Sequence, residues 1–233
     1  MIVGKLLFSS LQTEAVSLGS KYLEVTSASA PDPKSRAKSS HFIAHLEAQA
    51  QIMLASATAL RDELTASVPR FTLLTSKLTS NCAQSKSLDG KLTEALCRTL
   101  ITPIDCEDLK RLSHVIHKLT ATQLRLARTF DTATGAASAY GPLQDLIVKC
   151  AGSLDSAIGA LKGSQLHTHC HSLHANWRQA RTNLRGVHTG DWANDREIRH
   201  VLSAQLLYVE FAAELGYIKA AYDTLMRTRL KNG

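Results

Sequence analysis

The densest group of potential metal ligands in this sequence is a histidine-rich segment, HTHCHSLH, at residues 167–174. On a helix, His167, His171 and His174 would share one face, and Cys170 would lie one turn from His167 and His174. Imidazole and thiolate ligands suit zinc or copper. Metal-binding histidines usually also contact a carboxylate that orients the ring, and no acidic residue lies in this segment. We therefore favour a histidine-rich, partly exposed helix and predict no metal site.

A stripe of arginines follows directly. Arg178, Arg181 and Arg185 recur at steps of three and four residues, which places them on one face of a helix. The planar guanidinium group suits phosphate or carboxylate, so this stripe could hold a phospholipid, a nucleic acid or an acidic neighbouring subunit. A solvated helix face is an equal alternative. We predict these three arginines as the contacts to an anion or to a partner.

The only two tryptophans, Trp177 and Trp192, flank the turn predicted at residues 186–191. Large aromatic side chains at such a joint more often belong to the core than to a ligand cage. An exposed pair would instead mark a partner surface.

No sequence motif for catalysis is found. G-x-S-x-G, the Walker A loop, H-E-x-x-H and G-x-G-x-x-G are all missing from the sequence. The five cysteines are scattered and form no C-x-x-C pair, which favours a reducing compartment over a disulfide framework. We predict a protein that is not an enzyme and carries no cofactor.

The chain of 233 residues is basic, with 27 Lys and Arg against 20 Asp and Glu and a net charge of +7. A positive balance suits an acidic partner. No run of basic residues stands out, and Lys and Arg rarely alternate with aromatics, so a solvated basic surface is favoured over a nucleic-acid site. With 44% hydrophobic residues, the chain can bury a core.

Hydrophobic residues recur with helical spacing, and the prolines separate the periodic stretches. Asp105 is a good N-cap, with Glu107 and Asp108 in the first turn behind it. We predict an all-α chain, with a short amphipathic helix at about Ile2–Glu24 and a Ser- and Ala-rich linker at residues 27–40. The long helices are predicted at about Arg36–Val68, Arg70–Leu100, Asp105–Asp131, Pro142–Leu161, Gln165–Val187 and Ala193–Leu230.

No apolar stretch reaches the ~20 uninterrupted residues of a membrane-spanning helix. The best candidate, Val201–Tyr222, is interrupted by Glu210, Glu214 and Lys219, so we predict a buried amphipathic helix with no membrane span. The N-terminal segment is acid-poor and amphipathic like an organelle-targeting segment, but it contains no arginine.

Residues 98–109, RTLITPIDCEDL, form a distinctive joint between the second and third long helices. This stretch resembles the corresponding joint of PhoU-like proteins, the phosphate-transport accessory family, and the chain's last four residues, 230–233, resemble that family's C-terminus. The resemblance covers about residues 40–233. It implies a six-helix architecture of two three-helix bundles packed side by side, to which this chain would add the N-terminal helix.

Family members carry pairs of acidic residues that hold metal ions, and the resemblance places these pairs on non-acidic positions here. The four pairs fall on Cys82 and Lys86, on His117 and Ala121, on His174 and Arg178, and on Ala212 and Gly216. Lys86 and Arg178 would repel a cation. We therefore expect this chain to lack the family's metal chemistry.

We expect residues 1–40 to form an N-terminal segment and linker, and 41–233 a PhoU-like helical domain. The expected function is a non-enzymatic scaffold or accessory subunit of a larger complex, with other protein subunits and anionic lipid at a membrane surface as partners. Nucleic acid is not an expected partner. The matrix side of a mitochondrial membrane complex is the favoured location. The alternative is a regulator of a phosphate transporter at the cytoplasmic face of a bacterial membrane.

Overall fold

A computed structural model describes residues 33–99, 102, 104–132, 137–188 and 198–232. The chain divides into two compact units, Met1–Arg36 and Ala37–Gly233, and the description that follows concerns the second. The amphipathic helix predicted at Ile2–Glu24 lies outside the described residues.

The prediction of an all-α chain is confirmed, since the described residues form six helices and no strand. The helices are α2 (Pro33–Thr65), α3 (Phe71–Cys97), α4 (Cys106–Thr132), α5 (Ala137–Gly159), α6 (Leu166–His188) and α7 (Ile198–Asn232).

Two of the predicted boundaries need correction. Helix α2 begins at Pro33, inside the segment predicted as a linker, and a proline is well tolerated at the first helical position because its missing N–H would have no partner there. Pro142 was predicted to begin a helix, but it lies inside α5, which begins at Ala137. Tyr140, two residues before this proline, is buried.

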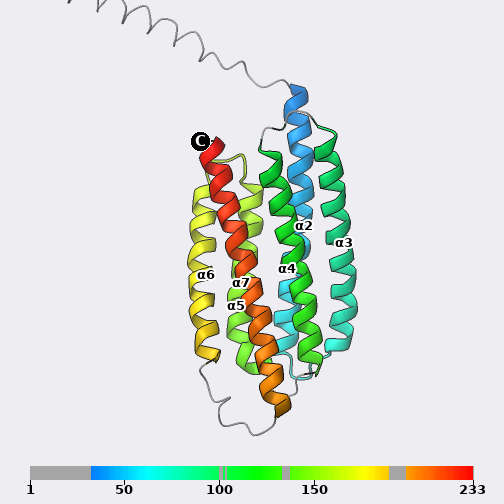
Figure 1. The fold of residues 1–233 in the computed structure, drawn as a ribbon, viewed down its shortest axis with the longest axis vertical. Coiled ribbons are helices and arrows are strands. Elements are labelled where there is room, and N and C mark those ends of the chain that lie inside the picture. The colour runs from blue at the N-terminus through cyan, green and yellow to red at the C-terminus, as the bar shows by residue number, and fades with distance from the viewer. Residues whose placement is uncertain (1–32, 100–101, 103, 133–136, 189–197, 233) are drawn as a thin grey trace, which may run out of the picture. The chain divides into compact units, whose positions relative to one another are not determined.

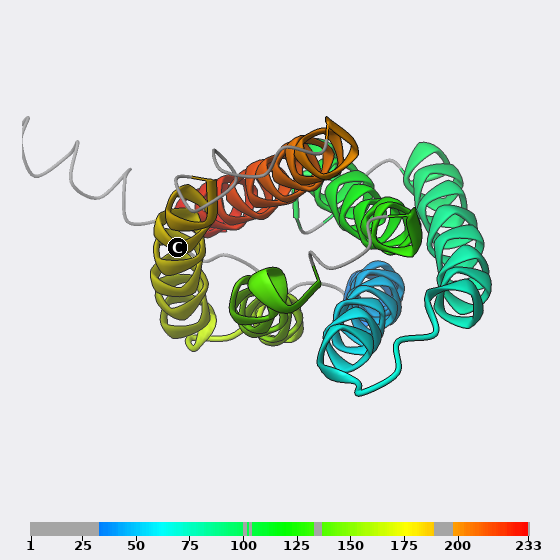
Figure 2. The ribbon, with the colours of Figure 1, turned by 90° about the horizontal axis from the view of Figure 1, so that it is seen from below.

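Consecutive helices run antiparallel, and they form two groups of three (Figure 1). Viewed end-on, α2, α3 and α4 lie together on one side, and α5, α6 and α7 on the other (Figure 2). Helix α4 packs against both α3 and α7, and α6 packs against both α5 and α7. Helices α4 and α7 therefore join the two groups along one side, and α2 and α5 lie next to each other on the other side, where Gln144 of α5 donates a hydrogen bond to the Ala57 carbonyl of α2 (Figure 2).

One end of the bundle is held by charged groups at the start of α4. The side chain of Asp105 accepts a hydrogen bond from the Glu107 backbone N–H at 2.9 Å, which confirms it as the helix cap. The Lys231 ammonium, near the end of α7, lies 2.6 Å from Asp105 Oδ2 and 2.9 Å from the buried Asp108 Oδ2. These contacts tie the end of α7 to the helix joint that contains residues 102–105.

The opposite end is held by a cluster of four aromatic rings from α3, α4, α5 and α7. Tyr140 and Phe211 stack at 5.1 Å between ring centroids, and Phe130 lies 5.9 Å from Tyr140 and 6.3 Å from Phe211. Phe71 stacks on Phe130 at 5.7 Å. The Tyr140 hydroxyl donates a hydrogen bond to the Ala204 carbonyl at 3.3 Å, and burial raises its pKa to about 12.

Helix α7 contains the one stretch of the described chain, Val201–Lys231, that is long and apolar enough by composition to cross a membrane. Of the most apolar 18-residue part of this stretch, 33% is buried in the bundle. Core helices of soluble proteins share this composition, and Leu207, Phe211 and Leu215 are buried here. The predicted lack of a membrane span therefore stays a prediction.

We expect Phe211→Ala to be strongly destabilising, because it removes the ring that contacts two of the other three in the cluster. Loss of a fully buried phenylalanine costs about 3–5 kcal/mol in unfolding free energy. Thermal or urea unfolding measures this loss. The matched control is Leu73→Ala on α3, which removes an exposed side chain and is expected to change stability little. Equal effects of the two substitutions would contradict the buried cluster.

Candidate functional site

The predicted arginine stripe lies on the exposed side of α6. Arg178, Arg181 and Arg185 are all exposed. The Arg181 guanidinium lies 5.5 Å from the centre of the Trp177 ring, within the range of a cation–π contact. The spacing predicted from the sequence is thus realised on one helix face.

Trp177 forms part of an aromatic layer between α6 and α7. Its indole N–H donates to the Leu215 carbonyl at 2.9 Å, which fixes the ring between the two helices. The His174 ring stacks on Trp177 at 5.6 Å and on Tyr222 at 4.8 Å. Trp177 is half-buried and packs against the core, as expected for a tryptophan near a helix joint. Trp192 lies outside the described residues.

A fourth cation, Lys219, approaches the arginine stripe from α7, and the sequence pattern marked it only as an interruption of an apolar stretch. The Lys219 ammonium lies 5.9 Å from the Trp177 ring centre and 5.4 Å from that of Tyr222, and it forms an ion pair with Asp223. We call Arg178, Arg181, Arg185 and Lys219 the basic surface.

The histidine-rich segment does not assemble into a metal centre. Cys170 is buried, and burial raises the pKa of its thiol to about 11, so the thiolate that binds metals is disfavoured. His167 Nδ1 lies 3.0 Å from the Arg229 guanidinium, and His174 is stacked between two rings. Within the described residues, no group of three or more His, Cys, Asp or Glu side chains is placed to hold a metal ion.

Of the positions that the PhoU-like resemblance assigns to metal ligands, Lys86 lies on α3 and His117 lies on α4, which packs against α3. Burial lowers the pKa of His117, Asp89 opposes this shift, and Lys86 is among the neighbouring positive groups that add to it. Lys86 is exposed on α3. His117 therefore has a carboxylate, Asp89, as well as positive groups in its surroundings.

A buried carboxyl group, Glu214 on α7, anchors a chain of polar side chains across the core. Gln123 Nε2 on α4 donates to Glu214 Oε1. Gln144 Nε2 on α5 donates to Gln123 Oε1 and to the Ala57 carbonyl of α2, both at 3.0 Å. One hydrogen-bonded chain therefore connects four helices and both helix groups.

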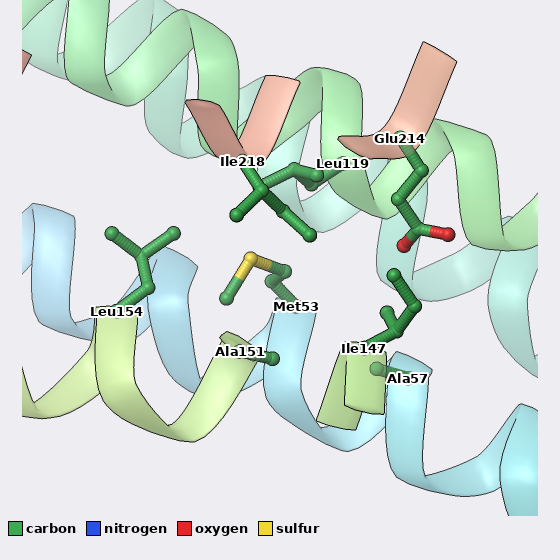
Figure 3. Close-up of a pocket in the computed structure, with 8 residues that line it drawn as sticks. All are labelled: Met53, Ala57, Leu119, Ile147, Ala151, Leu154, Glu214 and Ile218. Carbon is green, nitrogen blue, oxygen red and sulfur yellow. The ribbon is translucent and has the colours of Figure 1, made fainter. Parts of the chain in front are cut away.

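The Glu214 carboxyl closes a small apolar cavity at the centre of the bundle (Figure 3). A water-sized sphere can occupy about 10 Å³ of it, barely the space of one water molecule. Glu214 Oε2 has no hydrogen-bond partner, and burial raises the pKa of the carboxyl to about 8. The other side chains that line the cavity are Met53, Ala57, Leu119, Ile147, Ala151, Leu154 and Ile218.

Sequence reasoning treated Glu214 only as an interruption of an apolar helix. A usable signal was present, because Phe211, Leu215 and Ile218 follow core spacing and Glu214 lies among them. The partners Gln123 and Gln144 carry no comparable signal, since buried and exposed glutamines look alike in a sequence.

No model of a known protein family matches this chain, and no curated protein matches it. The PhoU-like resemblance therefore rests on residues 98–109 and the C-terminus, and it stays a prediction.

The buried carboxyl predicts a definite dependence of stability on pH. Glu214 ionises near its ordinary pKa of 4.5 in the unfolded chain and at about 8 in the bundle. Between these values the unfolded chain releases a proton that the folded chain keeps, so this group lowers the free energy of unfolding as pH rises. Glu214→Gln has no ionisable group at this position, so its free energy of unfolding should not fall in this way as pH rises. The variant should be more stable than wild type at pH 8 by on the order of a few kcal/mol, with little difference at pH 4.5. Urea unfolding at both pH values measures it.

The control is Glu210→Gln on the same helix. Glu210 pairs with Arg125 at 2.8 Å near the surface, so its substitution should cause a small loss of stability. A Glu214→Gln variant that is no more stable than wild type at pH 8 would contradict the buried, protonated carboxyl.

Proposed function

We propose that this protein is a non-enzymatic helical scaffold, an accessory subunit that binds an acidic segment of a partner protein on its basic surface. The observation that carries the proposal is the position of Arg181 and Lys219 over the ring of Trp177, with Arg178 and Arg185 exposed on the same face of α6. The net charge of +7 also favours a negatively charged partner.

The aromatic layer beneath the basic surface favours a partner-binding site over a helix face that is only solvated. Stacking against Trp177 restrains the Arg181 guanidinium, so less side-chain entropy is lost when it pairs with a carboxylate. Lys219 is held over two rings in the same way. Arginine and tryptophan together are the residue types most enriched at the energetic centres of protein interfaces.

An acidic protein segment fits this surface better than a nucleic acid does. The His174 ring stacks on Trp177, and Arg181 and Lys219 lie over the same ring, so its faces are not open for a base to stack on. The three arginines extend over about two turns of α6, and Lys219 lies beside them on α7, an extent that suits a short peptide carrying several carboxylates. In this proposal the partner is another subunit of the same assembly.

Charge reversal of the basic surface tests the proposal. We expect the purified wild-type chain to bind poly-glutamate at low salt and the Arg178→Glu, Arg181→Glu variant to lose at least about tenfold in affinity, because cations become anions. The control variant Lys77→Glu, Lys110→Glu carries the same change in net charge at exposed positions of α3 and α4. It should keep most of the binding.

Native purification from the source cells with the same variants extends the test. An accessory subunit should co-purify with defined partner chains, and the arginine variant should lose them while the lysine variant keeps them. Equal loss in both variants would show that net charge alone attracts acidic chains. Stronger binding to single-stranded RNA than to poly-glutamate, abolished by the arginine variant, would overturn the choice of partner.

A further inference from the structure

Helix α7 has an apolar outward face that the bundle leaves exposed. Val201, Leu202, Leu206 and Val209 are 43%, 58%, 58% and 52% exposed, and they follow one another along the first half of the helix. The same face continues through Ala212 and Gly216, both exposed. Contiguous apolar residues of this size on a surface mark an interaction site more often than chance exposure. We call these six residues the outward face of α7.

The beginning of α7 also extends beyond its neighbours. Figure 1 shows the first turns of α7 reaching lower than the adjoining ends of α4 and α6. Another molecule can therefore approach the outward face without meeting those two helices. The charged groups that border Val209 are Glu210 and Arg125, which pair at 2.8 Å and are neutral together.

The order of large and small residues on the outward face is complementary to itself. If two α7 helices pack antiparallel about a two-fold axis at Val209, Leu202 of one lies opposite Gly216 of the other. In the same register Leu206 lies opposite Ala212. Each of the two leucines then meets a small residue, as ridges meet grooves between packed helices, and the two Val209 side chains meet at the axis. We propose that the outward face of α7 binds a second copy of this chain in this antiparallel register.

Charge and space are consistent with a second copy. Glu210, next to Val209 in the chain, is neutralised by its ion pair with Arg125, so two-fold packing at Val209 does not bring two unpaired carboxylates together. A Cβ atom added at Gly216 would meet nothing within 4 Å, so the packing of one chain does not require glycine there. Glycine in a helix interior costs about 1 kcal/mol relative to alanine. At a helix–helix contact the missing side chain would let the second helix approach closely, which offers a reason for glycine at this position.

The expected dimer is of moderate affinity. The overlapping residues 202–216 form a helix face about 22 Å long. An interface built on one such face buries on the order of 1,000 Å² in total, near the lower limit of specific interfaces, so we expect dissociation in the micromolar range.

Sedimentation of the full chain across roughly 1–100 µM tests the dimer. The wild type should shift from 25.3 kDa toward twice that mass as concentration rises. Val209→Glu places two like charges on the axis, and Gly216→Leu fills the space opposite Leu202, so both variants should stay monomeric. The controls, Leu73→Glu and Gly90→Leu on α3, alter an exposed leucine and a helical glycine with the same open surroundings, and they should dimerise like wild type.

Cysteine cross-linking tests the register. In a Cys97→Ser, Cys106→Ser background, which removes the exposed native thiols, Val209→Cys should form a disulfide-linked dimer under mild oxidation. Leu202→Cys chains should cross-link to Gly216→Cys chains in a mixture but little to themselves.

Several outcomes would overturn the inference. They are a wild type that stays monomeric at the highest concentration, a dimer that Val209→Glu leaves intact, and cross-links in a parallel register. A monomeric wild type that floats with phosphatidylserine vesicles, and loses this with Val209→Glu, would assign the face to lipid instead. These variants leave the basic surface unchanged, so their failure is distinguishable from failure of the proposed function.

Discussion

The constraint on which the bundle depends is the burial of one carboxyl group where two sets of helices meet. Glu214 cannot be ionised there without a large cost, so it is held neutral and hydrogen-bonded through Gln123 to Gln144 and the Ala57 carbonyl. Apolar packing alone would tolerate sliding of α7 along α4. A hydrogen-bonded chain with fixed donors and acceptors tolerates it far less, so it determines the register between the two groups.

The ends of the bundle reinforce the same register. Lys231 meets Asp105 and Asp108 at one end, while Phe211 meets Phe130 and Tyr140 at the other. Helix α7 is therefore attached at three levels along its inner side. Its outward face instead leaves Val201, Leu202, Leu206 and Val209 exposed, and this contrast between the two sides favours an interface on this helix.

The two surfaces that we propose as contacts differ in the interactions that would hold a partner. The basic surface attracts by charge and is organised by aromatic rings, so its binding should weaken with salt. The outward face of α7 is apolar and selects by shape, so salt should affect it little. Both are carried by helices of the second group, while α2 and α3 complete the core. This division suits a scaffold that joins copies of itself and holds a partner, and neither surface requires a reactive group.

Sequence alone determined the elements and the sign of the charge. Hydrophobic spacing, the Asp105 cap and the arginine spacing predicted the described helices and the stripe of Arg178, Arg181 and Arg185, because these are local properties of neighbouring residues. Only the tertiary structure decided the rest. Helix α5 begins five residues before Pro142, and its first turns pack Tyr140 against Phe130 and Phe211. Cys170 is buried in the core, away from the exposed histidines, and Lys219 approaches the arginines from another helix. Glu214 acquires its raised pKa and its partners only when four helices, distant in sequence, surround it, and no local pattern encodes that environment.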